Sequence, residues 1–223
     1  MNVMLRGAVG SYAYGLNVPG SDHDVSEVFC YDVDFYLGLG SGKTTFNHKD
    51  HNTGEERTRY EVRHWAAQAA KGNPEFLQML FLDHDHMSEG GGLLYDHRHE
   101  FLSKAVYKPY TGCAYRHYKE ALEGKNPGKN FMSALRYLRQ CTEMLTEGTL
   151  HVSRVGRDAE QLKLLRTTPV TNAEMVAMWF DHEKRLKDAY NASRLPYTPN
   201  MERLGFVVQN ALTLELFEMY TEM

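Results

Sequence analysis

Residues 10–15 read Gly-Ser-Tyr-Ala-Tyr-Gly and residues 21–24 read Ser-Asp-His-Asp, and these two stretches decide the expected fold. An apolar run precedes the first stretch. Residues 22–29 alternate β-branched or aromatic side chains with polar ones, as in a half-buried strand. The order predicts a strand, a tight turn, a short helix and a second strand. Period two puts Asp22 and Asp24 on one face of that second strand, about 6.5 Å apart at the backbone.

Both stretches carry groups that suit phosphate chemistry. Two carboxylates at this spacing can share two Mg²⁺ ions about 4 Å apart, which is the geometry of in-line displacement at phosphorus. Gly10 can adopt a positive φ close to a ligand, and Ser11 adds a hydroxyl at a helix start, where free N–H groups favour phosphate. Tyr12 and Tyr14 flank the turn and either stack on a base or pack. Nucleotidyl transfer is therefore the predicted reaction, and the plain alternative is that the glycines only shape turns.

The pairing of Gly-Ser with Asp-x-Asp resembles the DNA polymerase β superfamily of nucleotidyltransferases. More narrowly, the chain resembles the predicted nucleotidyltransferases of RNA-repair pathways. Residues 59–81 are similar to that family's second block, in which a strand turns into a helix that stops at Gly-Asn-Pro. Short matches within residues 101–150 resemble its helical half, and residues 193–196 resemble its tail. The resemblance covers most of the chain.

The resemblance implies an α+β fold with two parts. A small mixed-sheet, polymerase beta-like catalytic half (residues 1–98) is expected to precede an all-helical half (residues 99–223). Three stripes of residues at helical spacing are expected to form core: Phe131, Leu135, Leu138 and Leu145; Met175, Trp179, His182, Leu186 and Ala189; Leu204, Val207, Ala211, Leu214 and Phe217. Residues 124–128 and 195–200 are expected to separate helices, and Asn200 can cap the last one.

The third metal ligand implied by the resemblance is Glu56. The family usually has an aspartate at this place, four residues before Tyr60, and a glutamate is also a competent ligand. Glu56, Thr58 and Tyr60 share one strand face. Glu55 and Glu61 are alternatives, although Glu61 points away from that face and suits a helix start.

The implied mechanism uses these carboxylates together. A nucleoside triphosphate is expected to bind its β- and γ-phosphates on the Gly10-Ser11 turn, with Mg²⁺ on Asp22 and Asp24. A second Mg²⁺, shared with Glu56, would lower the pKa of the attacking hydroxyl. Mn²⁺ is an alternative metal. Catalysis would consist of positioning and electrostatics, with pyrophosphate as the leaving group.

Basic residues of the family-like helical blocks are candidates for nucleotide binding. Lys104, Lys129 and Arg136 are expected to contact the triphosphate or the acceptor. Ser133 stands where the family tends to have a histidine, three residues before Arg136, so any role of that histidine is lost or moved.

Composition bounds the protein's environment and partners. The net charge is −4, so any polynucleotide must be gripped locally. Three widely spaced cysteines indicate neither a disulfide scaffold nor a zinc site, and they suit a reducing compartment. No leader and no membrane-spanning run is apparent, which predicts a cytoplasmic protein without a membrane partner.

The resemblance favours an RNA or tRNA end as acceptor of the nucleotide. Adenylylation of a protein partner, as by toxin-neutralising enzymes, and a non-catalytic nucleotide-binding module are the alternatives. The sequence leaves the preferred nucleotide and the oligomeric state open.

Two further motifs are interpreted as loops. Residues 38–44 resemble a phosphate-binding P-loop, but the spacing is one residue short. The histidine-rich residues 83–86 are expected in a surface loop rather than a metal site, because the glycine-rich residues 88–92 beside them indicate a mobile segment.

Overall fold

The computed structural model describes residues 1–50 and 55–221, and it contains one mixed five-stranded sheet. The strands are β1 (Asn2–Val9), β2 (Asp24–Cys30), β3 (Thr45–Lys49), β4 (Glu56–Glu61) and β5 (His84–Met87), in the order β3-β4-β2-β1-β5. The β2–β4 pair is parallel and the other pairs are antiparallel. This sheet with its helices confirms the predicted α+β, polymerase beta-like fold.

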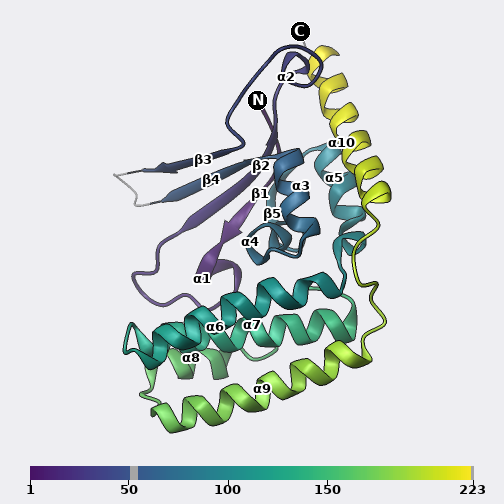
Figure 1. Cartoon of the computed structure of the whole chain (residues 1–223). Coiled ribbons are helices and arrows are strands. Elements are labelled where there is room, and N and C mark those ends of the chain that lie inside the picture. The colour runs from purple at the N-terminus through teal and green to yellow at the C-terminus, as the bar shows by residue number, and fades with distance from the viewer. Residues whose placement is uncertain (51–54, 222–223) are drawn as a thin grey trace.

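Helices occupy most of the remaining chain. They are α1 (Gly10–Ala13), α2 (Val33–Leu37), α3 (Val62–Ala70), α4 (Pro74–Leu77), α5 (Glu89–Asp96), α6 (Tyr107–Leu122), α7 (Pro127–Glu147), α8 (Ala159–Thr167), α9 (Asn172–Ala192) and α10 (Met201–Thr221), with short 3-10 turns η1 (Gln78–Leu80), η2 (Arg98–Phe101) and η3 (Lys104–Val106). Figure 1 shows α6 to α9 as a layer below the sheet, whereas α3, α4, α5 and α10 lie beside it. None of the described helices is long and apolar enough to cross a membrane.

Helix boundaries follow local sequence signals. Helix α7 begins with Pro127 in its first turn and ends at Gly148, which has a φ of +69°. The predicted break between α6 and α7 is confirmed. The predicted cap of the last helix is also confirmed, because Asn200 Oδ1 accepts a hydrogen bond of 3.0 Å from the Arg203 N–H.

One continuous apolar core joins the sheet to the helical layer, and it contains most of the predicted stripes. The buried members are Phe131, Leu135, Leu138, Leu145, Met175, Trp179, Leu186, Ala189, Leu204, Val207 and Ala211. His182 and Leu214 are half-buried, and Phe217 is 69% exposed. Phe217 was wrongly expected in the core, because repeated three-residue steps rotate a stripe around the helix and Glu215 takes the inward position instead.

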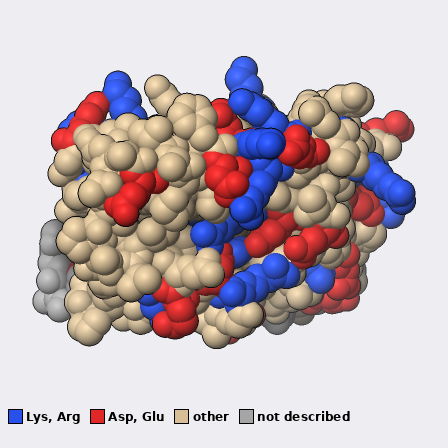
Figure 2. All heavy atoms as spheres, turned by 90° about the horizontal axis from the view of Figure 1, so that it is seen from below, with Lys and Arg blue, Asp and Glu red and all other residues tan. Residues whose placement is uncertain are grey.

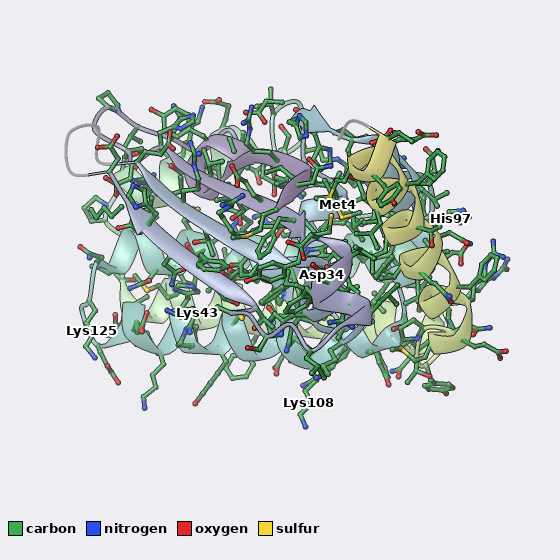
Figure 3. The ribbon with its side chains drawn as sticks, turned by 90° about the horizontal axis from the view of Figure 1, so that it is seen from above. Met4, Asp34, Lys43, His97, Lys108 and Lys125 are labelled. Atoms are coloured by element: carbon green, nitrogen blue, oxygen red, sulfur yellow. The ribbon has the colours of Figure 1, made fainter. Side chains whose placement is uncertain are left out.

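The last helix packs on the sheet half of the molecule. Figure 3 shows α10 beside Met4, and Glu215 of α10 is fully buried there. Its carboxylate accepts hydrogen bonds from the side chains of Asn2 and Ser88 and from the Gly90 N–H. The boundary expected at residue 98 stays a prediction, but the sequence that follows it supplies this helix to the sheet half.

The histidine-rich stretch is not a loop, which corrects the interpretation from sequence. His84–Met87 forms edge strand β5, and Ser88 caps α5 by accepting a hydrogen bond from the Gly91 N–H. A Cβ atom at Gly91 would lie 2.0 Å from the Met4 carbonyl oxygen. The glycines therefore permit close helix–strand packing rather than mobility. Residues 38–44 lie between α2 and β3, outside any helix or strand, as predicted.

Candidate active site

The junction of β1 and α1 faces the first residue of β2. Val9 ends β1 opposite Asp24, and Gly10 follows with a φ of +67°. A Cβ atom on Gly10 would lie 3.3 Å from Asp24 Oδ2, so glycine keeps the space before this carboxylate open. The positive φ predicted for Gly10 is confirmed.

Asp22 lies in the loop before β2 rather than in the strand, which differs from the sequence prediction. The ladder starts only at Asp24 because its partner strand ends at Val9. A turn closed by the Ser21 N–H, which donates to the Val18 carbonyl oxygen at 2.9 Å, leads into this loop. Both aspartates nevertheless line the same cavity.

That cavity has a volume of about 260 Å³ and brings the two halves of the sequence together. Its charged and turn residues are Gly10, Ser11, Asp22, Asp24, Lys129, Arg136 and Arg166. Ser133, at the position of the family's histidine, also lines it. In residues 1–50 and 55–221, no carboxylate forms an ion pair with any of the three basic side chains. The cavity therefore combines acidic groups with cations that are free to bind an anion.

Arg136 also lines a neighbouring cavity of about 290 Å³, together with Asp24 and Glu56. Its guanidinium carbon lies 3.8 Å from the ring centre of Tyr14 and 4.1 Å from that of Tyr137. Only 5% of Arg136 is exposed. The two rings hold a buried cation at the boundary between the two cavities.

Glu56 opens β4 and, of the three glutamates considered as the third metal ligand, is the one that lines a cavity with Asp24. Its Oε1 accepts a hydrogen bond of 2.5 Å from Lys49 Nζ. Glu55 forms an ion pair with Arg57 at 2.9 Å. Glu61 caps α3 by accepting a hydrogen bond from the His64 N–H, at the helix start suggested by the sequence.

The three acidic side chains repel one another in a partly buried site. Burial raises the pKa of Asp24, and the negative charges of Glu56 and Asp22 raise it further. Such crowding of carboxylates is what a divalent cation offsets, so the donor set fits Mg²⁺. In the described part of the chain, however, no three such side chains already stand in a metal-holding arrangement. Glu56 is turned to Lys49 instead.

Lys104 is the candidate that the structure keeps apart from the others. It lines neither cavity, and its Nζ lies 5.3 Å from the ring centre of Tyr190 and 5.0 Å from that of Tyr197. A cation between two rings in η3 is a packing arrangement.

Sequence reasoning missed Tyr137 and Arg166. Arg166 Nη1 donates a hydrogen bond of 2.9 Å to the Leu16 carbonyl oxygen, which holds the end of α8 against the cavity. Neither residue belongs to a local motif, since only the packing of α7 and α8 brings them to the site. For Tyr137, its place next to Arg136 was the one available signal.

Surface charge shows no uniformly basic face in the view of Figure 2. Basic and acidic side chains are interspersed over this side of the helical layer. This pattern agrees with the net charge of −4.

The mixed sheet, the Gly-Ser turn and the two aspartates that line one cavity are the arrangement expected of a nucleotidyltransferase of the polymerase beta type. A family model described as RlaP, the RNA repair pathway DNA polymerase beta family, matches residues 1–188, and the chain belongs to this family. No curated protein and no solved structure matches the chain.

Proposed function

We propose that the protein transfers a nucleoside monophosphate from a nucleoside triphosphate to a hydroxyl group at an RNA or tRNA end. The observation that carries the proposal is the cavity in which Asp22 and Asp24 meet the Gly10 turn and unpaired cations of the helical half. Membership of a polymerase beta-type family of RNA repair supports the reaction class and favours RNA as acceptor.

The triphosphate would bind between the turn and the helical half. The Ser11 hydroxyl and the open backbone at Gly10 suit phosphate oxygens. Lys129 and Arg136 would neutralise the triphosphate from the opposite wall. Because Tyr14 and Tyr137 hold Arg136 in place, its charge needs little reorganisation during the reaction.

Asp22, Asp24 and Glu56 would hold Mg²⁺, or Mn²⁺ in its place. A bound metal would offset charge on the reacting phosphorus and lower the pKa of the acceptor hydroxyl. Asp24 lines both cavities and so stands between the triphosphate side and the Glu56 side. The acceptor hydroxyl would therefore approach from Glu56, and pyrophosphate would leave along the Gly10 turn.

Nucleotide incorporation tests the proposal. The wild-type protein is incubated with each labelled nucleoside triphosphate, Mg²⁺ and either purified RNA, tRNA or total cell protein. We expect label on RNA or tRNA and none after the double change Asp22→Asn and Asp24→Asn. Asp34→Asn, which changes an exposed aspartate on α2, is the matched control and should leave incorporation intact.

Three results would contradict the proposal. Label on protein alone would indicate adenylylation of a protein partner. Triphosphate binding without transfer to any acceptor would indicate a non-catalytic module. Equal incorporation by the wild type and the double variant would separate the activity from this site.

A further inference from the structure

A groove of about 530 Å³ shares part of its wall, including Glu56, with the cavity that contains Asp24 and Glu56. Its volume falls within the roughly 300–1,000 Å³ of ligand sites. Strands β3 and β4 and the start of α4 form its walls. Glu56, Thr58 and Glu75 line both this groove and the cavity that contains Asp24, so a group entering the groove would reach the carboxylates at Glu56.

The charged side chains of the groove are Lys49, Arg57, Glu56 and Glu75, with His48 beside them. Arg57 forms ion pairs with Glu55 and Glu27 outside the shared wall. Glu75 accepts a hydrogen bond from the Tyr60 hydroxyl. Lys49 differs from Arg57, since among the described residues its ammonium group forms an ion pair with Glu56 alone.

Lys49 and Glu56 are register partners in the β3–β4 hairpin, which places their side chains together. Their side chains are 55% and 56% exposed. Exposed ion pairs of this kind contribute little stability and exchange readily. A divalent cation near Asp24 would therefore attract the Glu56 carboxylate away from Lys49 at a small cost in free energy.

Resting on the proposed function, we infer that Lys49 holds Glu56 until a divalent metal binds and then contacts a phosphate of an acceptor RNA strand in this groove. When Glu56 turns to the metal, Lys49 becomes the cation in the groove that has lost its partner. A phosphate of an RNA strand would be a new partner for Lys49. It would also place the terminal hydroxyl of that strand close to Glu56, where the transfer reaction needs it. A protein acceptor would offer no phosphate to Lys49.

The test compares Lys49→Met with Lys49→Arg and with the control Lys108→Met. Lys108 is an exposed lysine on α6 that points away from the sheet in Figure 3. The first measurement is Mn²⁺ affinity by calorimetry without nucleotide. Lys49→Met should bind Mn²⁺ about two- to fivefold more tightly, because the competitor for Glu56 is gone. Lys49→Arg and Lys108→Met should match the wild type.

The second measurement is the affinity of the protein for a fluorescently labelled single-stranded RNA in buffer that contains Ca²⁺. It records RNA binding and not nucleotide transfer. Lys49→Met should bind more weakly, and the slope of log affinity against log salt should fall by about 0.7. Lys49→Arg should restore both values. Lys108→Met reports the loss of a lysine charge outside the groove.

Either of two outcomes overturns the inference: unchanged or weaker Mn²⁺ binding by Lys49→Met, or a loss of RNA affinity no larger than that of Lys108→Met. Neither measurement depends on turnover. Absence of incorporation by the wild-type protein would instead contradict the proposed function, so the two failures are distinguishable.

Discussion

A Cβ atom on Gly10 would lie 3.3 Å from Oδ2 of Asp24, at a backbone position whose φ is +67°. Gly10→Ala should therefore cost about 1 kcal/mol of unfolding free energy through backbone strain and should also push into the carboxylate. Gly124→Ala is the matched control, because Gly124 has a φ of +80° and no atom within 4 Å of the added Cβ. Chemical denaturation should show similar losses for both variants. Only Gly10→Ala should lose nucleotide incorporation, and equal activity of the two variants would contradict this role.

Asp24→Asn should stabilise the metal-free protein at neutral pH. The folded protein holds the Asp24 proton more tightly than the unfolded chain, since burial and then the charges of Glu56 and Asp22 raise its pKa. Ionisation therefore lowers stability as pH rises from the ordinary value of 3.8 through the raised pKa. Because Asp24 is only partly buried, we expect a gain of about 0.5 kcal/mol.

Thermal melts at several pH values check the prediction for Asp24. The difference between Asp24→Asn and the wild type should vanish well below pH 3.8, where Asp24 is protonated in both the folded and the unfolded wild-type chain. Added Mg²⁺ should raise the melting temperature of the wild type more than that of the variant. A variant that is less stable than the wild type at neutral pH would be evidence against carboxylate crowding.

Arg136→Met should impair nucleotide binding more than folding. Arg136 is buried between two rings, pairs with no carboxylate of the described residues and donates a hydrogen bond of 2.8 Å to Gln140 Oε1. Methionine, an apolar side chain of similar length, fills its place but leaves that acceptor unpaired, so we expect a loss of about 1–2 kcal/mol of stability. Loss of its charge from the cavity should weaken triphosphate binding by about tenfold or more. Calorimetric titration with a nonhydrolysable nucleoside triphosphate measures the effect.

Arg154→Met supplies the contrast to Arg136→Met. Arg154 is 1% exposed and forms ion pairs of 2.7 Å with Glu143 and Asp158. Removing it leaves two largely buried carboxylates with only their second partners, Arg139 at 2.6 Å from Asp158 and Arg157 at 3.6 Å from Glu143, at a cost of about 3 kcal/mol. If Arg136→Met proved as destabilising as Arg154→Met, Arg136 would be a structural residue instead.

Glu215→Leu should destabilise the sheet half by about 2–3 kcal/mol, because the buried Gly90 N–H and the Ser88 hydroxyl lose their acceptor. Glu202→Leu changes an exposed glutamate on the same helix and should stay within about 0.5 kcal/mol of the wild type. Urea denaturation measures both. Equal stabilities of the two variants would mean that the buried contacts of Glu215 contribute little to the sheet half. Helix α10 lies outside the residues that the family model matches.

Local patterns predicted the elements that depend on neighbours in sequence. The stripe of α7, the cap at Asn200 and the positive φ of Gly10 follow from helical spacing, side-chain chemistry and the freedom of glycine. The same reasoning failed at residues 83–92. A glycine-rich segment indicates mobility until a tertiary neighbour, here the Met4 backbone, requires the missing side chains.

The candidate site divides in the same way. Gly10 and Asp24 lie close in sequence and were predicted together, whereas Lys104 shares a sequence block with the site but lies outside both cavities. Tyr137 and Arg166 reach the site through helix packing alone. A shared sequence block does not determine which cavity a side chain lines. That is determined by the packing of α7 and α8 against the sheet.

The hydrogen bond between Asn2 and Glu215 joins residues that are 213 positions apart in the chain, so they are translated at widely different times. A ribosome releases strand β1 early, but the helix that buries one side of it emerges only after residues 201–221 have been translated. Contacts over such a sequence separation form late in folding. The carboxylates proposed to hold the metal are therefore translated long before the sheet that carries Asp24 can finish folding, and a nascent chain completes this sheet half only after α10 has emerged.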